Sequence, residues 1–144
     1  METDKKLKTY ITFLASLEGQ HRLMYLLDIS KDADLLEENL KDDTTKIFGC
    51  LSNTYVKTYI KDNVVKIKVS SDSLFMKGLL YLLQLHVSGK NIEEVKNIDA
   101  MKFMERVGTK HFSSSLRQNG FIQVMSKVKN EIDHYERGNT KSTG

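Results

Sequence analysis

The hydrophobic residues in the first part of the chain recur with the period of an α-helix. Residues 4–17 have leucine and isoleucine at three- and four-residue spacing, and the following stretch EGQHRLMYLLDISKDA keeps that period. Residues 31–43, in contrast, hold six acidic residues. The pattern predicts two helices followed by a charged surface connection that is partly helical.

The middle of the chain alternates apolar and polar residues, which is the period of a β-strand. The runs TYVKTYIK and VVKIKV are rich in β-branched and aromatic residues, and Asp62 and Asn63 between them tolerate a positive φ. This pattern predicts an antiparallel hairpin. A short run at residues 46–48 predicts a third strand beside it.

The second half of the chain returns to helical periods. The serine-rich segment 70–73 is typical of a helix N-terminus, and the run 74–85 is apolar on nearly every side, which predicts a buried central helix. Two short helices are predicted at 92–97 and 100–107, and a longer amphipathic helix at 116–135.

These elements predict an α+β fold in which helices pack on one face of a small three-stranded antiparallel sheet. We expect residues 1–137 to form a single domain, because a chain of 144 residues can bury one sizeable core. The last residues, 138–144, are polar and are expected to form a disordered tail.

Composition narrows the range of functions. One cysteine cannot close an internal disulfide, and with four scattered histidines it does not supply the usual ligands of a zinc site. No run approaches the ~18–20 apolar residues of a membrane-spanning helix. The formal net charge of +3 is too small to indicate a nucleic-acid partner. We therefore expect a cytoplasmic protein, in a compartment that keeps thiols reduced.

The lone cysteine is the first candidate for chemistry. Cys50 follows Gly49 in a predicted loop between the acidic connection and the hairpin. A thiol is reactive as the thiolate and only where a partner can reach it, and a neighbouring glycine leaves room for such an approach. A small buried hydrophobe is the alternative interpretation, and these residues alone leave both open.

Three further residues have two interpretations each. Asp72 is either the N-cap of the central helix or a loop carboxylate near Cys50. Arg117 is either an ordinary surface arginine or an anchor for an anion. His111 could pair with Cys50 for nucleophilic catalysis, but no sequence feature brings the two together and no oxyanion-hole motif is present.

The second face of the predicted hairpin interleaves basic and aromatic residues. Such a face can bind single-stranded nucleic acid, although lysines on a solvated sheet are more commonly a protection of its edges. The residues concerned are Lys57, Lys61, Lys66, Lys68, Tyr55 and Tyr59.

Three motifs in order resemble the SufE family of sulfur acceptors, over roughly residues 5–135. The first is the glycine–cysteine pair with its polar run, GCLSNTY from Gly49. The second is SDS followed by MKGL, which contains Asp72 and Lys77. The third is RQNGF, which starts at Arg117. Each motif is weak alone, and their order and spacing around a single cysteine carry the resemblance.

The chain also departs from the family pattern. The run after Cys50 reads Leu-Ser-Asn where the family has Gln-Ser-Gln, and Tyr55 stands where the family has tryptophan. Serines replace the Thr/Ser-Pro before Arg117, and His111 falls one residue away from the family's histidine. These departures leave a role for His111 in doubt and do not affect Cys50.

The resemblance implies a sulfur-transfer accessory protein rather than a stand-alone enzyme. Cys50 would accept persulfide sulfur from a cysteine desulfurase of the SufS or CsdA kind, stimulate that desulfurase, and deliver sulfur to a SufBCD-like iron–sulfur scaffold. The supporting residues would be Gly49, Ser52, Asp72, Lys77 and Arg117.

The resemblance also implies that the protein needs no cofactor and no metal of its own, since pyridoxal phosphate belongs to the desulfurase. The single cysteine argues against a cluster scaffold, which needs several thiolates. We expect a monomer or weak dimer without membrane or nucleic-acid partners. The alternatives are a non-catalytic regulator of the same fold and, less favoured, a nucleic-acid binder that uses the hairpin lysines.

Overall fold

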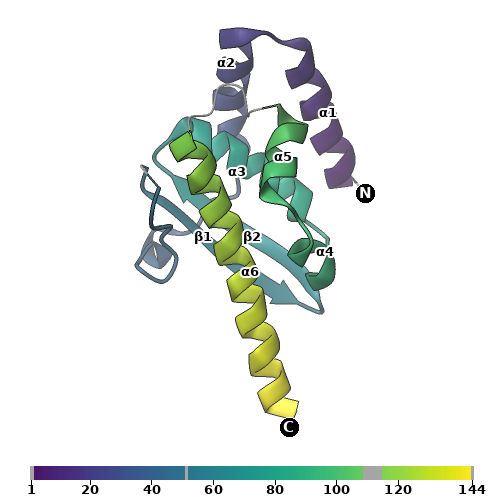
Figure 1. The fold of residues 1–144 in the computed structure, drawn as a ribbon, viewed down its shortest axis with the longest axis vertical. Helices are drawn as coiled ribbons and strands as arrows, with labels where there is room; N and C mark the ends of the chain where they lie inside the picture. Colours follow the sequence, from purple (N-terminus) through teal and green to yellow (C-terminus); the bar gives the residue numbers. More distant parts are fainter. Residues whose placement is uncertain (1, 51, 109–114, 144) are drawn as a thin grey trace.

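The computed structural model describes residues 2–50, 52–108 and 115–143, with the side chains of the last helix described over 118–138 (Figure 1). Helices cover one side of a β-hairpin, as Figure 1 shows. In chain order the elements are α1 (Glu2–Ser16), α2 (Gly19–Ile29), η1 (Ser30–Asp32), η2 (Glu38–Leu40), β1 (Thr54–Lys61), β2 (Val64–Ser71), α3 (Leu74–Val87), α4 (Ile92–Lys96), α5 (Ala100–Val107) and α6 (Ser115–Thr143).

The predicted hairpin is confirmed. β1 and β2 pair antiparallel from Thr54 opposite Ser71 to Lys61 opposite Val64. Asp62 and Asn63 form the turn with φ of 52° and 65°, and two consecutive positive φ angles match the right-handed twist of the strands they join.

The predicted third strand is wrong, because the described chain has a two-stranded sheet. Lys46 forms only an isolated bridge with Tyr55, supported by a 2.8 Å hydrogen bond from Ile47 N to Thr54 O. Gly49 then adopts a φ of +84° and turns the chain away before a ladder can extend. The segment 46–48 therefore touches the sheet edge and leaves it to form the loop that carries Cys50.

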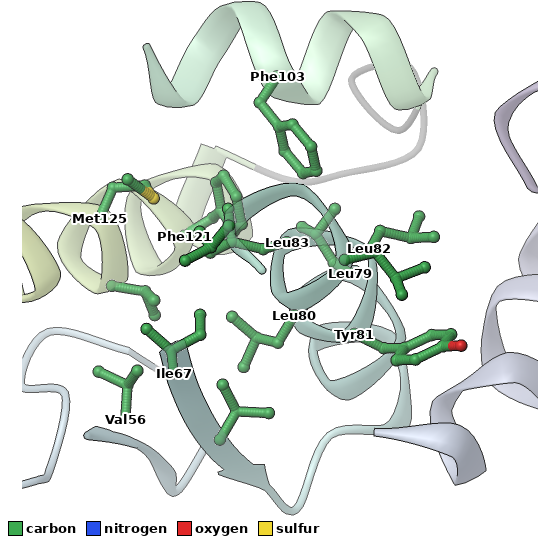
Figure 2. Packing of buried hydrophobic residues seen from close by; sticks show 14 of the residues in the cluster. Val56, Ile67, Leu79, Leu80, Tyr81, Leu82, Leu83, Phe103, Phe121 and Met125 are labelled. Atoms are coloured by element: carbon green, nitrogen blue, oxygen red, sulfur yellow. The ribbon is translucent and has the colours of Figure 1, made fainter. Parts of the chain in front are cut away.

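The central helix predicted over 74–85 is α3, and it forms the middle of the core. Gly78 allows α2 to approach it closely, since a Cβ there would lie 2.3 Å from the backbone oxygen of Leu26. Figure 2 shows the side chains that surround α3. The leucines of α3 meet side chains from the hairpin, α5 and α6. The buried residues are Leu79, Leu80, Leu82 and Leu83 of α3 and Val56, Ile67, Phe103, Phe121 and Met125 of its neighbours.

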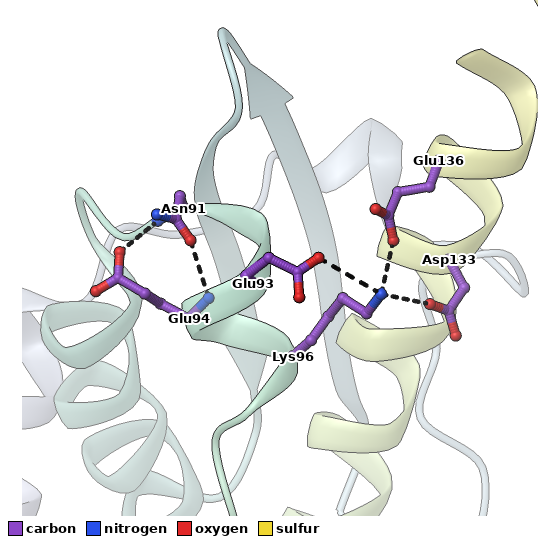
Figure 3. Close-up of polar contacts among 6 residues, drawn as sticks. All are labelled: Asn91, Glu93, Glu94, Lys96, Asp133 and Glu136. Atoms are coloured by element: carbon purple, nitrogen blue, oxygen red, sulfur yellow. Dashed lines mark hydrogen bonds and ion pairs between the residues drawn. The ribbon is translucent and has the colours of Figure 1, made fainter. Parts of the chain in front are cut away.

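The helix α6 is longer than predicted. It passes the expected end at Tyr135 and continues to Thr143, through most of the stretch that was expected to be a disordered tail. In Figure 1 its C-terminal end projects beyond the hairpin. Lys96 of α4 contributes to this extension, because its Nζ lies 2.9 Å from a Glu136 oxygen and 3.7 Å from an Asp133 oxygen (Figure 3).

The helix α4 is fixed at both ends by polar contacts, which Figure 3 shows together. Asn91 and Glu94 form a capping box, in which Glu94 N donates to Asn91 Oδ1 at 2.9 Å and Asn91 N donates to Glu94 Oε1 at 3.1 Å. The hydrogen bond from Lys96 to Glu136 raises the pKa of Lys96.

Within the described residues, no helix is long and apolar enough to cross a bilayer.

His86 is a half-buried titratable group that packs against the core. Its ring stacks on Phe103 with 5.0 Å between the centroids, and its Nδ1 has no hydrogen-bond partner in the described chain. Burial lowers the pKa of His86 to about 4, and the nearby Lys90 and Arg106 act in the same direction. The folded protein therefore holds this imidazole in its neutral form.

We predict that His86 makes the protein less stable in mild acid. The unfolded chain takes up the proton near pH 6.5, whereas the folded chain takes it up near pH 4. Between these values the unfolded state binds more protons, so the free energy of unfolding falls as the pH falls. His86→Leu should lose this contribution, and its stability relative to the wild type should rise from pH 7 to pH 4 in urea titrations.

Replacement of an exposed histidine, His21→Gln, is the matched control and should leave the pH dependence of the wild type unchanged. If His86→Leu and the wild type lose stability in parallel over this range, the imidazole of His86 is not responsible.

Candidate functional site around Cys50

Cys50 lies on the loop between the Lys46 bridge and β1, and it is the only cysteine. Gly49 before it is exposed and has a φ of +84°, a conformation that side-chain-bearing residues rarely adopt. The Cys50 side chain is half-buried and unpaired, so it is neither a core residue nor a fully solvated one. The thiol therefore occupies a shallow recess next to a turn that depends on glycine.

Hydroxyl groups form one side of this recess. The Cys50 Sγ lies 3.2 Å from Ser52 Oγ and 3.7 Å from Thr54 Oγ1. These two hydroxyls are 2.8 Å apart, and Thr54 Oγ1 is 2.9 Å from Ser71 Oγ on the neighbouring strand. Thr54 is fully buried, so its position is fixed by the sheet. The thiol thus meets a preformed set of groups that can donate to a sulfur anion.

Gly120 and Met76 form the opposite side. A Cβ at Gly120 would lie 2.9 Å from Cys50 Sγ and 3.3 Å from Met76 Cε, which is closer than such atoms normally approach. The thiol can lie against the backbone of α6 only because residue 120 has no side chain. Met76 comes from the first turn of α3 and is buried, so the recess is polar on one side and apolar on the other.

Asp72 holds the C-terminal end of the Cys50 loop through hydrogen bonds with Asn53. Its two carboxylate oxygens each accept a hydrogen bond from Asn53, one from the backbone N and one from Nδ2, both at 3.0 Å. Its own N donates to Asn53 O at 3.1 Å. The N-cap of α3 is Ser73, whose Oγ accepts from Met76 N at 3.2 Å. The capping interpretation of Asp72 is therefore wrong, and the carboxylate holds the segment that follows Cys50.

The remaining candidate residues from the sequence are Lys77, Arg117 and His111. Lys77 is half-buried in the first turn of α3, and its N donates to Ser73 O at 2.9 Å. Arg117 lies in the first turn of α6, but its side chain is outside the described residues, as is the whole of His111. The described chain contains no group of three or more residues that could hold a metal ion.

Two large apolar side chains near the loop are exposed. Phe48, two residues before Cys50, is 63% exposed, and Leu74, two residues after Asp72, is 53% exposed. Single exposed apolar side chains are common on protein surfaces, and these two are of interest because they flank the Cys50 loop and Asp72 in the sequence.

The sequence did not indicate the full set of residues around the thiol. Thr54, Ser71 and Met76 lie within the motifs GCLSNTY, SDS and MKGL, but nothing in the sequence indicated that their side chains meet the thiol. Gly120 did have a signal of its own, since an isolated glycine within a helical pattern often marks a close approach. The partner of that approach, Cys50, could be identified only in three dimensions.

The fold and the site define a class of small α+β protein in which a single half-buried thiol lies next to a turn that contains glycine. The family model "SufE: Fe-S metabolism associated domain" matches residues 8–132. The chain therefore belongs to the SufE family, which functions in iron–sulfur metabolism.

Known relatives match most of this chain. An uncharacterized SufE-like protein of Rhizobium meliloti is 25% identical over 81% of this chain and 86% of its own. The cysteine desulfuration protein SufE of Plasmodium falciparum is 25% identical over 86% of this chain and 52% of its own. A solution structure of a hypothetical protein from Thermus thermophilus has the same fold, with a TM-score of 0.72, 18% identity, and coverage of 90% of this chain and 94% of that one.

We predict that Gly120→Ala exposes the thiol. The added methyl group would lie 2.9 Å from Cys50 Sγ, so the loop must move outward while the helix, which favours alanine, stays in place. Alkylation of Cys50 by iodoacetamide should become severalfold faster. Gly138→Ala is the matched control, because it lies in the same helix with open space around it and should leave the rate unchanged. Slower or unaltered alkylation of Gly120→Ala would contradict the packing described here.

Proposed function

We propose that this protein is a sulfur carrier, in which Cys50 accepts sulfur from the persulfide of a cysteine desulfurase and delivers it for iron–sulfur cluster assembly. The observation that carries the proposal is the recess of Cys50, where a single thiol lies between hydroxyl groups and a glycine of α6. Family membership and relatives named cysteine desulfuration protein support the same chemistry.

The transfer is a thiol exchange. The Cys50 thiolate attacks the terminal sulfur of the partner's persulfide, a new S–S bond forms, and the bond between that sulfur and the partner's cysteine breaks. The partner's cysteine leaves as a thiolate and takes up a proton. No oxidant or reductant is consumed, and one cysteine is sufficient because a carrier needs no resolving thiol.

The hydroxyl groups around Cys50 suit an anionic sulfur. Ser52 and Thr54 can each turn an O–H toward Sγ, at 3.2 Å and 3.7 Å, while Ser71 accepts or donates behind them. Hydrogen bonds to the charged form favour that form. We infer that this set stabilises the thiolate before transfer and the persulfide anion after it.

The loop has the two properties that a carrier needs, protection and release. Against Gly120 and Met76 the sulfur is shielded on its apolar side. Gly49 provides a backbone position that can change conformation without a side-chain penalty, and the hold of Asp72 on Asn53 limits how far the loop opens. We propose that Cys50 leaves its recess when the desulfurase docks and returns to it with the sulfur attached.

The partners follow from this chemistry. The desulfurase supplies pyridoxal phosphate, so the carrier needs no cofactor or resident metal of its own, and the exposed Phe48 and Leu74 would contact that enzyme and stimulate it. A SufBCD-like scaffold would receive the sulfur. Lys77 and Arg117 would support this region, and a reducing compartment, which we propose to be the cytoplasm, would keep the lone thiol available.

The direct test is the intact mass of the protein after incubation with a cysteine desulfurase and L-cysteine. We expect a gain of one sulfur atom on the wild type, removed by a reducing thiol, and no gain on Cys50→Ser. Loss of the thiol should leave the melting temperature nearly unchanged, because the substitution is small and the site is half-buried. Equal sulfur uptake by both proteins, or none by the wild type, would refute the carrier function.

A second prediction separates the loop contact from the helix cap. Asp72→Asn removes the charge that holds Asn53 and keeps Ser73 as the cap, so alkylation of Cys50 should become faster with little change in melting temperature. Ser73→Ala should do the reverse, and lose about 0.5–2 kcal/mol of stability with little change in alkylation. The assignment of Asp72 fails if its variant alters only the melting temperature.

A further inference from the structure

A second cavity lies beside the Cys50 loop and is not used by the sulfur transfer. It is a cleft of about 600 Å³ between the segment 43–48 and α6, with Thr58 of β1 at its base. Its volume falls within the range of about 300–1,000 Å³ that is usual for small-molecule sites. Cys50 is not among the residues that line it.

The cleft has one cation and one anion on each wall. The loop wall carries Asp43 and Lys46, and the α6 wall carries Lys127 and Glu131. Within the described residues none of these four side chains forms an ion pair within 4.0 Å, although Lys127 acts on the charge of Glu131, and the ammonium of Lys46 lies 5.6 Å from the centre of the Phe48 ring. The four formal charges sum to zero.

Among these four side chains, Glu131 has the most clearly defined environment. It is half-buried, and one of its carboxylate oxygens accepts a hydrogen bond from Thr58 Oγ1 at 2.8 Å. Burial raises the pKa of Glu131, while the Thr58 hydrogen bond and the nearby Lys127 and Lys57 act in the opposite direction. A positively charged ligand group at this carboxylate would further favour its charged form.

The length of the cleft limits the size of the ligand. Its α6 wall runs from Gln123 to Tyr135, which corresponds to about 18 Å along the helix axis. An extended peptide covers about 3.3–3.6 Å per residue, so the wall matches a chain of about three to five residues and is long for a single amino acid. Ile47, Phe48 and Tyr135 offer apolar contacts, and Asn130 offers an amide.

We propose that this cleft binds a short zwitterionic peptide, with its free amino group at Glu131 on the α6 wall and its free carboxylate at Lys46 on the loop wall. A ligand with only negative charge would meet Asp43 and Glu131, and a ligand with only positive charge would meet the two lysines. Like charges in contact are costly, so the paired arrangement selects a molecule that carries both. This site goes beyond the sulfur-carrier function and does not depend on it.

The test is a titration of the ¹⁵N-labelled full chain with the tripeptide Gly-Leu-Gly, followed by NMR. We expect saturable shifts of amides in 43–48 and 123–135, with a dissociation constant on the order of 1 mM or tighter. N-acetylated and C-amidated forms of the same peptide should each bind about tenfold more weakly or not at all, because each lacks one charge.

Variants link the binding to the named charges. Glu131→Gln keeps an acceptor for Thr58, so it should fold and yet bind about tenfold more weakly, and Lys46→Gln should do the same. Glu18→Gln and Lys5→Gln, which are exposed and far from the cleft, are the matched controls and should bind as the wild type does.

Three results would overturn the proposal. They are the absence of saturable shifts, equal binding of a blocked peptide, and unchanged binding by both cleft variants. Sulfur uptake by Cys50 is measured separately by mass, so failure of one proposal is distinguishable from failure of the other.

Discussion

The contact between Cys50 and the backbone of α6 at Gly120 is the constraint on which the site depends. It joins a loop and a helix that are far apart in the sequence, and it exists only because residue 120 lacks a side chain. The helix is in turn fixed on the core through Phe121, Val124 and Met125, which are buried directly after the glycine. The depth at which the thiol lies is therefore set by the same helix that closes the core.

The two ends of the Cys50 loop are held in different ways. After the cysteine, Asn53 is bound to Asp72 by three hydrogen bonds and leads directly into a paired strand. Before the cysteine, Gly49 makes a turn with a positive φ and open space around its Cα. The segment before Gly49 is also held, by the hydrogen bond from Ile47 N to Thr54 O, so Gly49 is the position at which the loop can change direction.

Local signals in the sequence were sufficient where structure is decided by neighbouring residues. The turn at Asp62 and Asn63, the buried helix α3 and the short helices α4 and α5 could be predicted for this reason. The third strand was overpredicted because strand formation depends on a partner, and the bridge at Lys46 ends at the turn of Gly49. The end of α6 was missed because its ion pair with Lys96 spans 40 residues.

The functional site shows the same contrast between local sequence signals and contacts that form only in three dimensions. The pair Gly49 and Cys50 was a candidate from the sequence, although those residues alone also allowed a small buried hydrophobe, and the roles of Asp72 and Ser73 were ambiguous because both residue types can cap a helix. Geometry alone decides between them, as Ser73 faces the helix and Asp72 faces Asn53. The segment from Lys46 to Cys50 then forms the wall of the charged cleft at its start and carries the thiol at its end. Phe48 belongs to both surfaces, because it lines the cleft and is exposed two residues before the thiol.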